Sequence, residues 1–307
     1  MSYDARIERA RAGDRRTLAR LVTLVEDGTR DGDEILASVY GSGGDARVTG
    51  ITGAPGAGKS TLVDHLIDRA RPSGDVAVVA VDPSSPFTGG AILGDRVRMQ
   101  RHTDDPGVYI RSLANRGHLG GLSGTTPRVV ALLDGIGFPE ILVETVGVGQ
   151  AEVEVASAAD TVVVVVNPGW GDSVQAAKAG LLEIGDVFVV NKADRAGADE
   201  ATAELLRMLE IGPPRAWRPP VLRTVAPTGE GVDAVWDAIA DHRRYLRSSG
   251  DLAMRRSARA VSEVETAVRE QLRLRFAGEG VAGSDLVDRI LARDLDPWTA
   301  ARSIVEP

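Results

Sequence analysis

Residues 47–62 read RVTGITGAPGAGKSTL, and this stretch decides the fold. Val48 and Ile51 lie in a short apolar run that predicts a buried strand, and Leu62 begins an apolar pattern at helical spacing. Between them, GAPGAGKS at residues 53–60 matches the phosphate-binding loop pattern G-x-x-x-x-G-K-S/T in full. Strand, glycine-rich loop and helix therefore follow one another in the order that such a loop requires.

The residue types in this loop suit a phosphorylated ligand. Glycines let the backbone curl so that its N–H groups point inward, and the N-terminus of the following helix adds partial positive charge. Lys59 can reach the outer phosphates, and the hydroxyl of Ser60 can bind Mg²⁺. The predicted nucleotide contacts in the loop are Gly53, Ala54, Pro55, Gly56, Ala57, Gly58, Lys59, Ser60 and Thr61.

Composition narrows the class of protein. The chain has 307 residues, of which 43% are hydrophobic, and its 44 acidic and 36 basic side chains give a net charge of −8. This balance argues against nucleic acid or an anionic membrane as the main partner. Because the chain has no cysteine, it has no disulfide framework or thiolate metal site. No apolar run approaches the ~20 residues that span a bilayer, and the charged N-terminus lacks a signal-peptide core, so we expect a cytoplasmic protein.

From residue 47 to about 240, apolar strand patterns alternate with helical ones. Several strands, such as TVVVVV, are continuous rather than alternating, which indicates burial on both faces in a parallel sheet. The sequence predicts an α/β, doubly wound, mostly parallel sheet with helical extensions at both ends. We expect an N-terminal helical extension at 1–44, a nucleotide domain at 45–241 and a C-terminal helical arm at 242–307. The predicted strands are 48–52, 76–82, 108–112, 140–145, 161–167, 187–191 and 221–225.

A second motif, NKAD at residues 191–194, follows the apolar strand DVFVV. The carboxylate of Asp194 can accept hydrogen bonds from both N1–H and the exocyclic amine of guanine, whereas adenine would leave it unpaired. Asn191 would brace the loop, and the stem of Lys192 would lie against the base. The backbone N–H groups near Val225, Ala226 and Pro227 would contact the guanine carbonyl oxygen.

Two acidic residues stand at the ends of predicted strands, and a third follows one of these strands in the sequence. Glu144, in ETVG, stands where small GTPases carry D-x-x-G, so it can hold a Mg²⁺-bound water while the amide of Gly147 senses the γ-phosphate. Asp82 ends the second strand, and Asp95 follows in GAILGDRVRM. Two acids near a phosphate site suggest Mg²⁺ ligation or positioning of water, although their spacing also fits solvated side chains.

Together these motifs resemble the methylmalonyl-CoA mutase-associated GTPases of MeaB/ArgK type. The resemblance covers nearly the whole chain. It is carried by GAPGAGKSTL, VDPSSPFTGGAILGDRVRM, RSLANRGHLGGLS, ILVETVGVGQAE, VVNKAD and YLRSSGDLAMRR.

The resemblance implies a homodimeric, Mg²⁺-dependent GTPase that acts as a chaperone of an adenosylcobalamin-dependent acyl-CoA mutase, gating cofactor loading and the release of damaged cofactor. It adds Asp82, Asp95 and Glu144 to Lys59 and Ser60 as the magnesium and catalytic set. Lys178 becomes a candidate switch residue. Which acyl-CoA mutase is the partner stays open, with methylmalonyl-CoA mutase as the default.

The C-terminal arm is basic, because nine arginines and four acids between residues 242 and 276 give it a charge of +5. The resemblance implies a dimerisation arm, and the alternative is a helix packed on its own domain. Two other functions remain open. A GTPase metallochaperone would need soft or imidazole ligands, but the chain offers only His65, His102, His118 and His242, scattered in the sequence. A P-loop kinase, of the kind once named an amino-acid transport kinase, would use ATP, which NKAD disfavours.

Overall fold

The computed structural model describes residues 2–83, 100–115, 125–145, 155, 157–170, 175–278 and 285–305. The chain divides into two compact units, Met1–Arg259 and Ala260–Pro307. The first unit contains a seven-stranded sheet. Within the described residues, the strands are β1 Arg47–Gly53, β2 Val76–Pro83, β3 Val108–Asn115, β4 Glu140–Thr145, β5 Thr161–Val166, β6 Val187–Asn191 and β7 Val221–Thr224.

The strands follow the order β3-β2-β4-β1-β5-β6-β7, and every pairing is parallel. The prediction of a doubly wound, mostly parallel sheet is confirmed, and the seven predicted strands all form, with ends that differ by a few residues at most. All six residues of β5 are buried, as expected for a strand covered on both faces. β1 lies near the middle of the sheet, with β4, β2 and β3 on one side and β5, β6 and β7 on the other. In doubly wound folds, ligands bind where the strand order reverses direction in this way.

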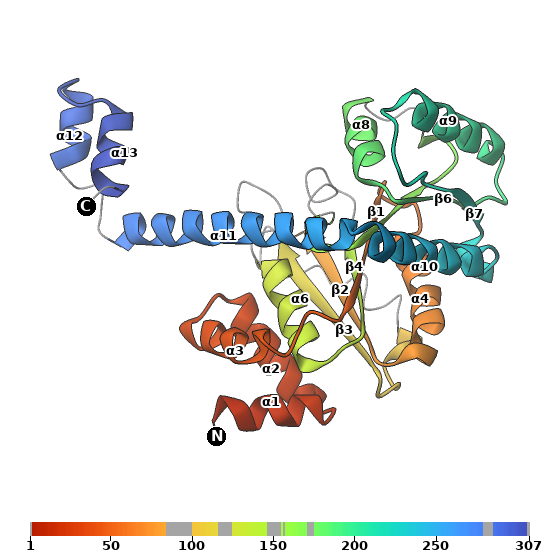
Figure 1. The fold of residues 1–307 in the computed structure, drawn as a ribbon, viewed down its shortest axis with the longest axis horizontal. Coiled ribbons are helices and arrows are strands. Elements are labelled where there is room, and N and C mark those ends of the chain that lie inside the picture. The colour runs from red at the N-terminus through yellow and green to blue at the C-terminus, as the bar shows by residue number, and fades with distance from the viewer. Residues whose placement is uncertain are drawn as a thin grey trace. The chain divides into compact units, whose positions relative to one another are not determined.

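Helices cover both faces of the sheet (Figure 1). One face packs against α4 (Lys59–Ala70) and α10 (Val232–Ser249) through Leu62, Leu66 and Ile239. The other packs against α6 (Thr125–Ile136), α8 (Gln175–Ile184), α9 (Ala198–Ile211) and the N-terminal helices, with Leu21 and Leu132 fully buried. The helices are α1 Tyr3–Arg11, α2 Arg15–Glu26, α3 Arg30–Tyr40, α4 Lys59–Ala70, α6 Thr125–Ile136, α8 Gln175–Ile184, α9 Ala198–Ile211, α10 Val232–Ser249, α11 Asp251–Gly278, α12 Asp285–Leu291 and α13 Pro297–Val305. Short 3₁₀ turns are η1 Arg71–Ser73, η2 Gln100–His102 and η4 Ala226–Thr228.

The N-terminal helices α1–α3 form a small bundle against α6 (Figure 1). Asp14 is the N-cap of α2: its carboxylate accepts from the Thr17 amide at 2.9 Å, and this bond lowers the pKa of Asp14 to about 2. The linker after α3 is held by Asp134 of α6, which accepts from the amides of Gly44 and Ala46 at 2.6 and 3.0 Å. The extension is therefore part of the first unit's core.

Three buried acids stand at the amino ends of β4, β5 and β6: Glu140, Asp160 and Asp186. Each binds arginine. The members of this amino-edge ion cluster are Glu140 with Arg47 and Arg243, Asp160 with Arg256 and Arg259, and Asp186 with Arg255. Burial alone would raise the pKa of the Asp160 carboxyl, but the hydrogen bonds and charges of its two arginines lower it.

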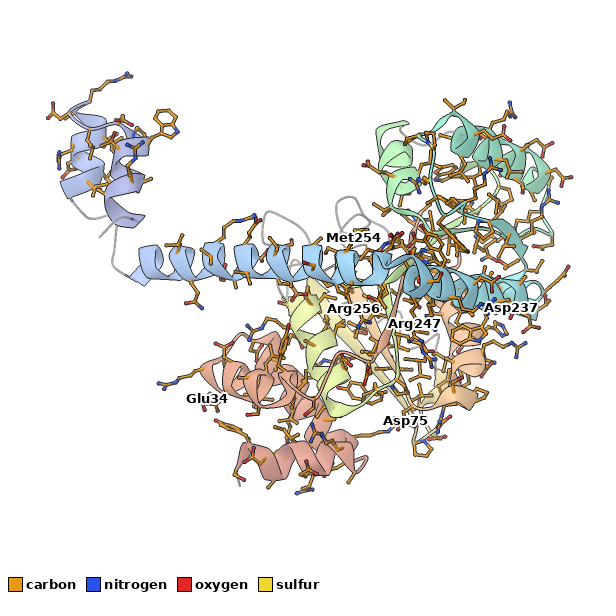
Figure 2. All side chains as sticks on the ribbon, in the orientation of Figure 1. Glu34, Asp75, Asp237, Arg247, Met254 and Arg256 are labelled. Atoms are coloured by element: carbon orange, nitrogen blue, oxygen red, sulfur yellow. The ribbon has the colours of Figure 1, made fainter. Side chains whose placement is uncertain are left out.

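Gly250, at φ +83°, separates α10 from α11. The first turns of α11 belong to the first unit, since Arg255, Arg256 and Arg259 bind its buried acids. Met254, 65% exposed, and Arg256 leave α11 on different sides (Figure 2). The second unit contains the rest of α11 with α12 and α13. Among the described residues, no helix combines the length and the apolar character that crossing a bilayer requires.

Candidate functional site

The predicted phosphate-binding loop connects the end of β1 to the start of α4. Gly53 has φ +129°, and a Cβ there would lie 1.9 Å from the carbonyl oxygen of Val165 on β5. Gly58 has φ +94°, and a Cβ there would lie 2.3 Å from Nδ2 of Asn191. Both positions accept only glycine, because the backbone is left-handed and neighbouring elements approach it closely. Pro55 and Gly56 lie exposed at the top of the loop, and Ala57 is buried.

Lys59 is the first residue of α4 and only 5% of its surface is exposed. Its Nζ donates to the carbonyl oxygens of Gly53 and Ala54, at 2.7 and 3.0 Å. The ammonium group is thus aimed back over the loop that the glycines shape. This is the orientation that contact with the outer phosphates of a nucleotide requires.

Ser60 and Glu144 meet beneath the loop. The Ser60 hydroxyl donates to Oε1 of Glu144 at 2.7 Å, and the two residues are 4% and 1% exposed. Glu144 lies on β4, which pairs directly with β1 and places Glu144 opposite Ile51. The sheet order therefore brings together a hydroxyl and a carboxylate that are 84 residues apart in the sequence.

Asn191 connects three segments. Its Nδ2 donates to the carbonyl oxygen of Ala57 at 2.7 Å, and its Oδ1 accepts from the Thr224 hydroxyl and the Ala226 amide, both at 3.0 Å. The side chain is buried. One amide group therefore joins the NKAD loop to both the phosphate-binding loop and the 224–227 loop.

Lys192 and Asp194 complete the NKAD loop. Lys192 has a left-handed backbone, φ +59°, and its Nζ donates to the carbonyl oxygen of Gly56 at 2.6 Å. The Asp194 side chain is exposed, as a group that reads an incoming base must be. The adjacent Ala193 amide donates to the Thr224 carbonyl oxygen at 3.0 Å, so the two loops that would flank the base are held together.

The amides of the 224–227 loop are already engaged in this structure. The N–H of Val225 donates to the Glu230 carbonyl oxygen and that of Ala226 donates to Asn191, each at 3.0 Å, while Pro227 has no N–H. The predicted contact of this loop with the guanine carbonyl oxygen would therefore have to share or replace one of these hydrogen bonds.

Several predicted residues lie wholly or partly outside the described part of the chain. Asp82 is in β2, two strands from β1, but its side chain is not described. Asp95 and Gly147 lie outside the described residues, as does the side chain of Lys178 in α8. Their predicted roles stay predictions.

Three threonines that sequence reasoning missed support the site. Thr224 binds Asn191, and at the tips of β1 and β4 the Thr145 hydroxyl donates to the Thr52 hydroxyl at 3.0 Å. All three side chains are buried. No spacing rule marks them, because buried threonine is common in strands and only the sheet order makes Thr52 and Thr145 neighbours.

A parallel sheet that carries a phosphate-binding loop after its central strand, with an NKAD loop braced against it, defines a P-loop GTPase. A solved structure described as a LAO/AO transport system kinase has a similar fold, with a TM-score of 0.69 and 29% identity over 99% of this chain and 96% of that one. The family described as methylmalonyl Co-A mutase-associated GTPase MeaB matches residues 18–280, and the chain belongs to this family. The resemblance read from the motifs is thereby confirmed.

Two relatives agree with this assignment. A Pyrococcus horikoshii protein named as a GTPase, PH0274, is 49% identical over 308 residues, covering 99% of this chain and 97% of its own length. The mouse methylmalonic aciduria type A homolog, named as mitochondrial, is 39% identical over 213 residues, 67% of this chain and 51% of its own. The chain is a GTPase that binds GTP and GDP.

Proposed function

We propose that this GTPase is Mg²⁺-dependent and acts as a chaperone of an adenosylcobalamin-dependent acyl-CoA mutase, gating cofactor loading and protecting or reactivating the mutase. Methylmalonyl-CoA mutase is the first candidate partner. The family match carries the proposal, because it extends over residues 18–280 and its description names association with that mutase. The name of the mouse relative points to the same metabolism.

Magnesium suits the donor set beneath the loop. Mg²⁺ prefers hard oxygen ligands and is held in nucleotide sites by one or two protein oxygens together with phosphates. Ser60 and Glu144 supply a hydroxyl and a carboxylate oxygen 2.7 Å apart and buried. We assign the metal to these two, with Asp82 and Asp95 as further members of the set. The bound ion would neutralise charge on the terminal phosphates.

The chain's own groups have distinct tasks in hydrolysis. The loop amides bind phosphate oxygens, and Lys59 leaves its two carbonyl partners to contact the outer phosphates, which stabilises the charge that develops there. Glu144 accepts from Ser60 and keeps that hydroxyl at a fixed position beneath the loop. Asp194 selects guanine through two hydrogen bonds to the base, while Asn191 keeps the base-reading loop in register with the phosphate loop.

The mutase role is tested by measuring GTP turnover with and without the partner. Purified methylmalonyl-CoA mutase from the same organism should raise the rate, and tagged mutase should retain the GTPase in a manner that depends on GTP, GDP or a non-hydrolysable analogue. Lys59→Ala, which we expect to keep the fold and to lose hydrolysis, is the matched control for contaminating GTPases. Turnover and retention unchanged by every cobalamin-dependent acyl-CoA mutase of that organism would refute the proposal.

A homodimer would use the distal half of α11. Val261, Val264 and Val268 follow helical spacing and are 58%, 64% and 52% exposed, and leaving such an apolar stripe in water is costly. We infer that a second copy of the chain covers this stripe. Val264→Glu should convert the dimer to a monomer in light scattering coupled to size exclusion, whereas Ser262→Glu, on a neighbouring exposed position, should not. A monomeric wild-type chain would contradict the inference.

The kinase alternative has one observation behind it, since the similar solved structure is described as a transport system kinase. A titration of the protein with GTP and ATP separates this alternative from a GTPase. The metallochaperone alternative lacks such support: in the described part of the chain, no three His, Cys, Asp or Glu side chains gather in a way that could hold a metal ion.

A further inference from the structure

Two threonines at the tips of β1 and β4 form a hydrogen bond next to the phosphate-binding loop. The Thr145 hydroxyl donates to the Thr52 hydroxyl at 3.0 Å, and both side chains are fully buried. The last pair in the backbone register of the two strands is Ile51 with Glu144. Thr52 and Thr145 stand one position beyond that pair, so their side chains carry the link between β1 and β4 one step further toward the loop. We name these two residues the threonine pair.

Thr52 and Ser60 flank the phosphate-binding loop in the sequence, and each bonds to the tip of β4. Ser60, after the loop, donates to Oε1 of Glu144 at 2.7 Å, and Thr52, before the loop, accepts from the next residue of β4. Because successive side chains of a strand point to opposite faces, the two bonds lie on opposite faces of the sheet. Glu144 points toward α4, whereas Val143, on the same face as Thr145, packs in the cluster on the α6 side. The tip of β4 is therefore joined to both ends of the loop, once on each face.

The length of the bond between the two threonines affects the position of Glu144. The two hydroxyl oxygens are 3.0 Å apart, whereas two methyl groups in their place would rest at about 3.5–4.0 Å. Glu144 and Thr145 are consecutive in β4, so a shift of the Thr145 backbone moves Glu144 with it. The bond from Ser60 to Glu144 is 2.7 Å long, and a displacement of roughly 0.5–1 Å would take it beyond the range of a good O–H···O hydrogen bond.

We propose that the threonine pair is a positioning element for the metal site beneath the loop, which holds the tip of β4 so that Glu144 and Ser60 bind one Mg²⁺ together. The inference rests on the proposed assignment of Mg²⁺ to these two residues. The two threonine hydroxyls face away from Ser60 and act through the backbone that carries Glu144. Nucleotide affinity without metal depends on other groups, the loop amides and the NKAD loop, so the pair should change the Mg²⁺ requirement more than nucleotide binding itself.

The test measures how much Mg²⁺ the nucleotide complex requires. A fluorescent, non-hydrolysable GTP analogue is bound in EDTA, and Mg²⁺ is then added until the dissociation rate of the analogue stops falling. Thr145→Val has nearly the same shape but no hydroxyl, and it should raise the half-saturating Mg²⁺ concentration roughly tenfold, the lower end of the effect for residues that support a metal ligand. The dissociation constant in EDTA should stay within about twofold. Thr145→Ser retains the donor and should keep most of the wild-type Mg²⁺ affinity.

A double variant separates the metal site from stability. Removing one hydroxyl leaves the other without this partner in the core, which lowers stability for a reason unrelated to metal. Thr52→Val combined with Thr145→Val removes both hydroxyls, so its melting temperature should return toward that of the wild type. Its Mg²⁺ requirement should stay raised, because two methyl groups cannot approach to 3.0 Å.

Thr161→Val is the matched control. Thr161 is a buried threonine at the amino end of β5, and its hydroxyl lies 3.0 Å from Nδ1 of His242. The substitution removes a buried hydroxyl contact at the opposite edge of the sheet, so it should lower stability and leave the Mg²⁺ requirement unchanged.

The outcomes distinguish this inference from the proposal on which it rests. A wild-type Mg²⁺ requirement in Thr145→Val and in the double variant would overturn the inference alone. So would a rise that Thr161→Val shows equally, or one that disappears in the double variant as its stability returns. If Mg²⁺ does not slow release of the analogue from the wild-type protein, the assignment of the metal to Ser60 and Glu144 is wrong, and the inference fails with it. The assay contains no mutase, so its result is independent of the chaperone role.

Discussion

The two edges of the sheet use buried polar groups in opposite ways. At the amino edge, Glu140, Asp160 and Asp186 each face arginine, as in the bidentate contacts of Arg255 with Asp186 at 2.9 and 2.8 Å. At the carboxyl edge, Lys59 donates to carbonyl oxygens and Glu144 accepts from a hydroxyl. The contacts described at the amino edge join opposite charges, whereas those described at the carboxyl edge include bonds from charged groups to backbone carbonyls and a hydroxyl.

This difference separates groups that hold the fold from groups that hold a ligand. In a buried ion pair neither charge is available to bind a ligand. Losing one partner leaves the other charge uncompensated in a low dielectric, which lowers the stability of the fold. A lysine on backbone carbonyls can exchange them for phosphate oxygens of higher charge without leaving a buried charge unpaired. We expect substitutions at the amino edge to affect stability, and substitutions at the carboxyl edge to affect nucleotide chemistry.

The largest effect should follow Asp194→Asn. An amide cannot accept from both N1–H and the exocyclic amine of guanine, so preference for guanine over xanthine nucleotides should fall by roughly 10⁴ and reverse. Competition binding of GTP and xanthosine triphosphate measures this. Asp199→Asn, at an 83% exposed acid on the next helix, is the control and should bind GTP normally. Retained GTP preference in Asp194→Asn would show that another group reads the base.

Asp160→Asn should chiefly lower stability. Removing one partner of a buried ion pair costs about 3–5 kcal/mol, and we expect the lower end, because Arg256 is 33% exposed and can turn to water. Urea unfolding checks the value. Asp233→Asn, in the exposed pair with Arg69, should cost less than about 1 kcal/mol. A large loss of GTP affinity in folded Asp160→Asn protein would contradict the expectation that substitutions at the amino edge affect stability and not nucleotide binding.

Lys59→Ala should leave the melting temperature near that of the wild type and reduce GTP hydrolysis about 10²–10³-fold, as loss of one preorganised charge-stabilising donor does. Single-turnover assays with excess protein measure the chemical step directly. If Lys59→Ala lowered the melting temperature as strongly as it lowered hydrolysis, the main role of Lys59, which is only 5% exposed, would be to stabilise the fold and not to bind phosphate.

The smallest effect is a pH dependence at the amino edge. His242 is fully buried and its Nδ1 lies 3.0 Å from the Thr161 hydroxyl. Burial lowers the pKa of His242 from 6.5 to about 4, against the opposing charge of Asp186. Since the unfolded chain takes up this proton first, stability should fall by about 3 kcal/mol as pH drops from 6.5 to 4.

Unfolding curves at several pH values test this expectation. His242→Gln should lose most of the slope between pH 6.5 and 4, while other acids of lowered pKa, such as Asp160, contribute below that range in both proteins. An identical slope between pH 6.5 and 4 in the variant would show that His242 does not carry the pH dependence in this range.

In the arm at 242–307, the partners of the arginines could not be predicted from the sequence. Its nine arginines between residues 242 and 276 make it net basic, and the sequence leaves open whether it is a dimerisation arm or a helix packed on its own domain. In the structure, Arg243 reaches Glu140, and Arg255, Arg256 and Arg259 reach Asp160 and Asp186. Their acids lie 69–103 residues away in sequence, so no local pattern could pair them. The exposed stripe at Val261, Val264 and Val268 is the part that helical spacing alone predicts.

Sequence by itself determined what is local: the order of strand, loop and helix around residues 53–60, the seven strands, and the residue types at the phosphate and base loops, because glycine conformation and apolar runs act over a few residues. The tertiary structure decided which distant groups meet. Glu144 contacts Ser60 because β4 lies beside β1, Asn191 spans three loops, and Thr145 contacts Thr52. Strand order is set by how all the buried faces pack at once, which no single stretch of the chain encodes.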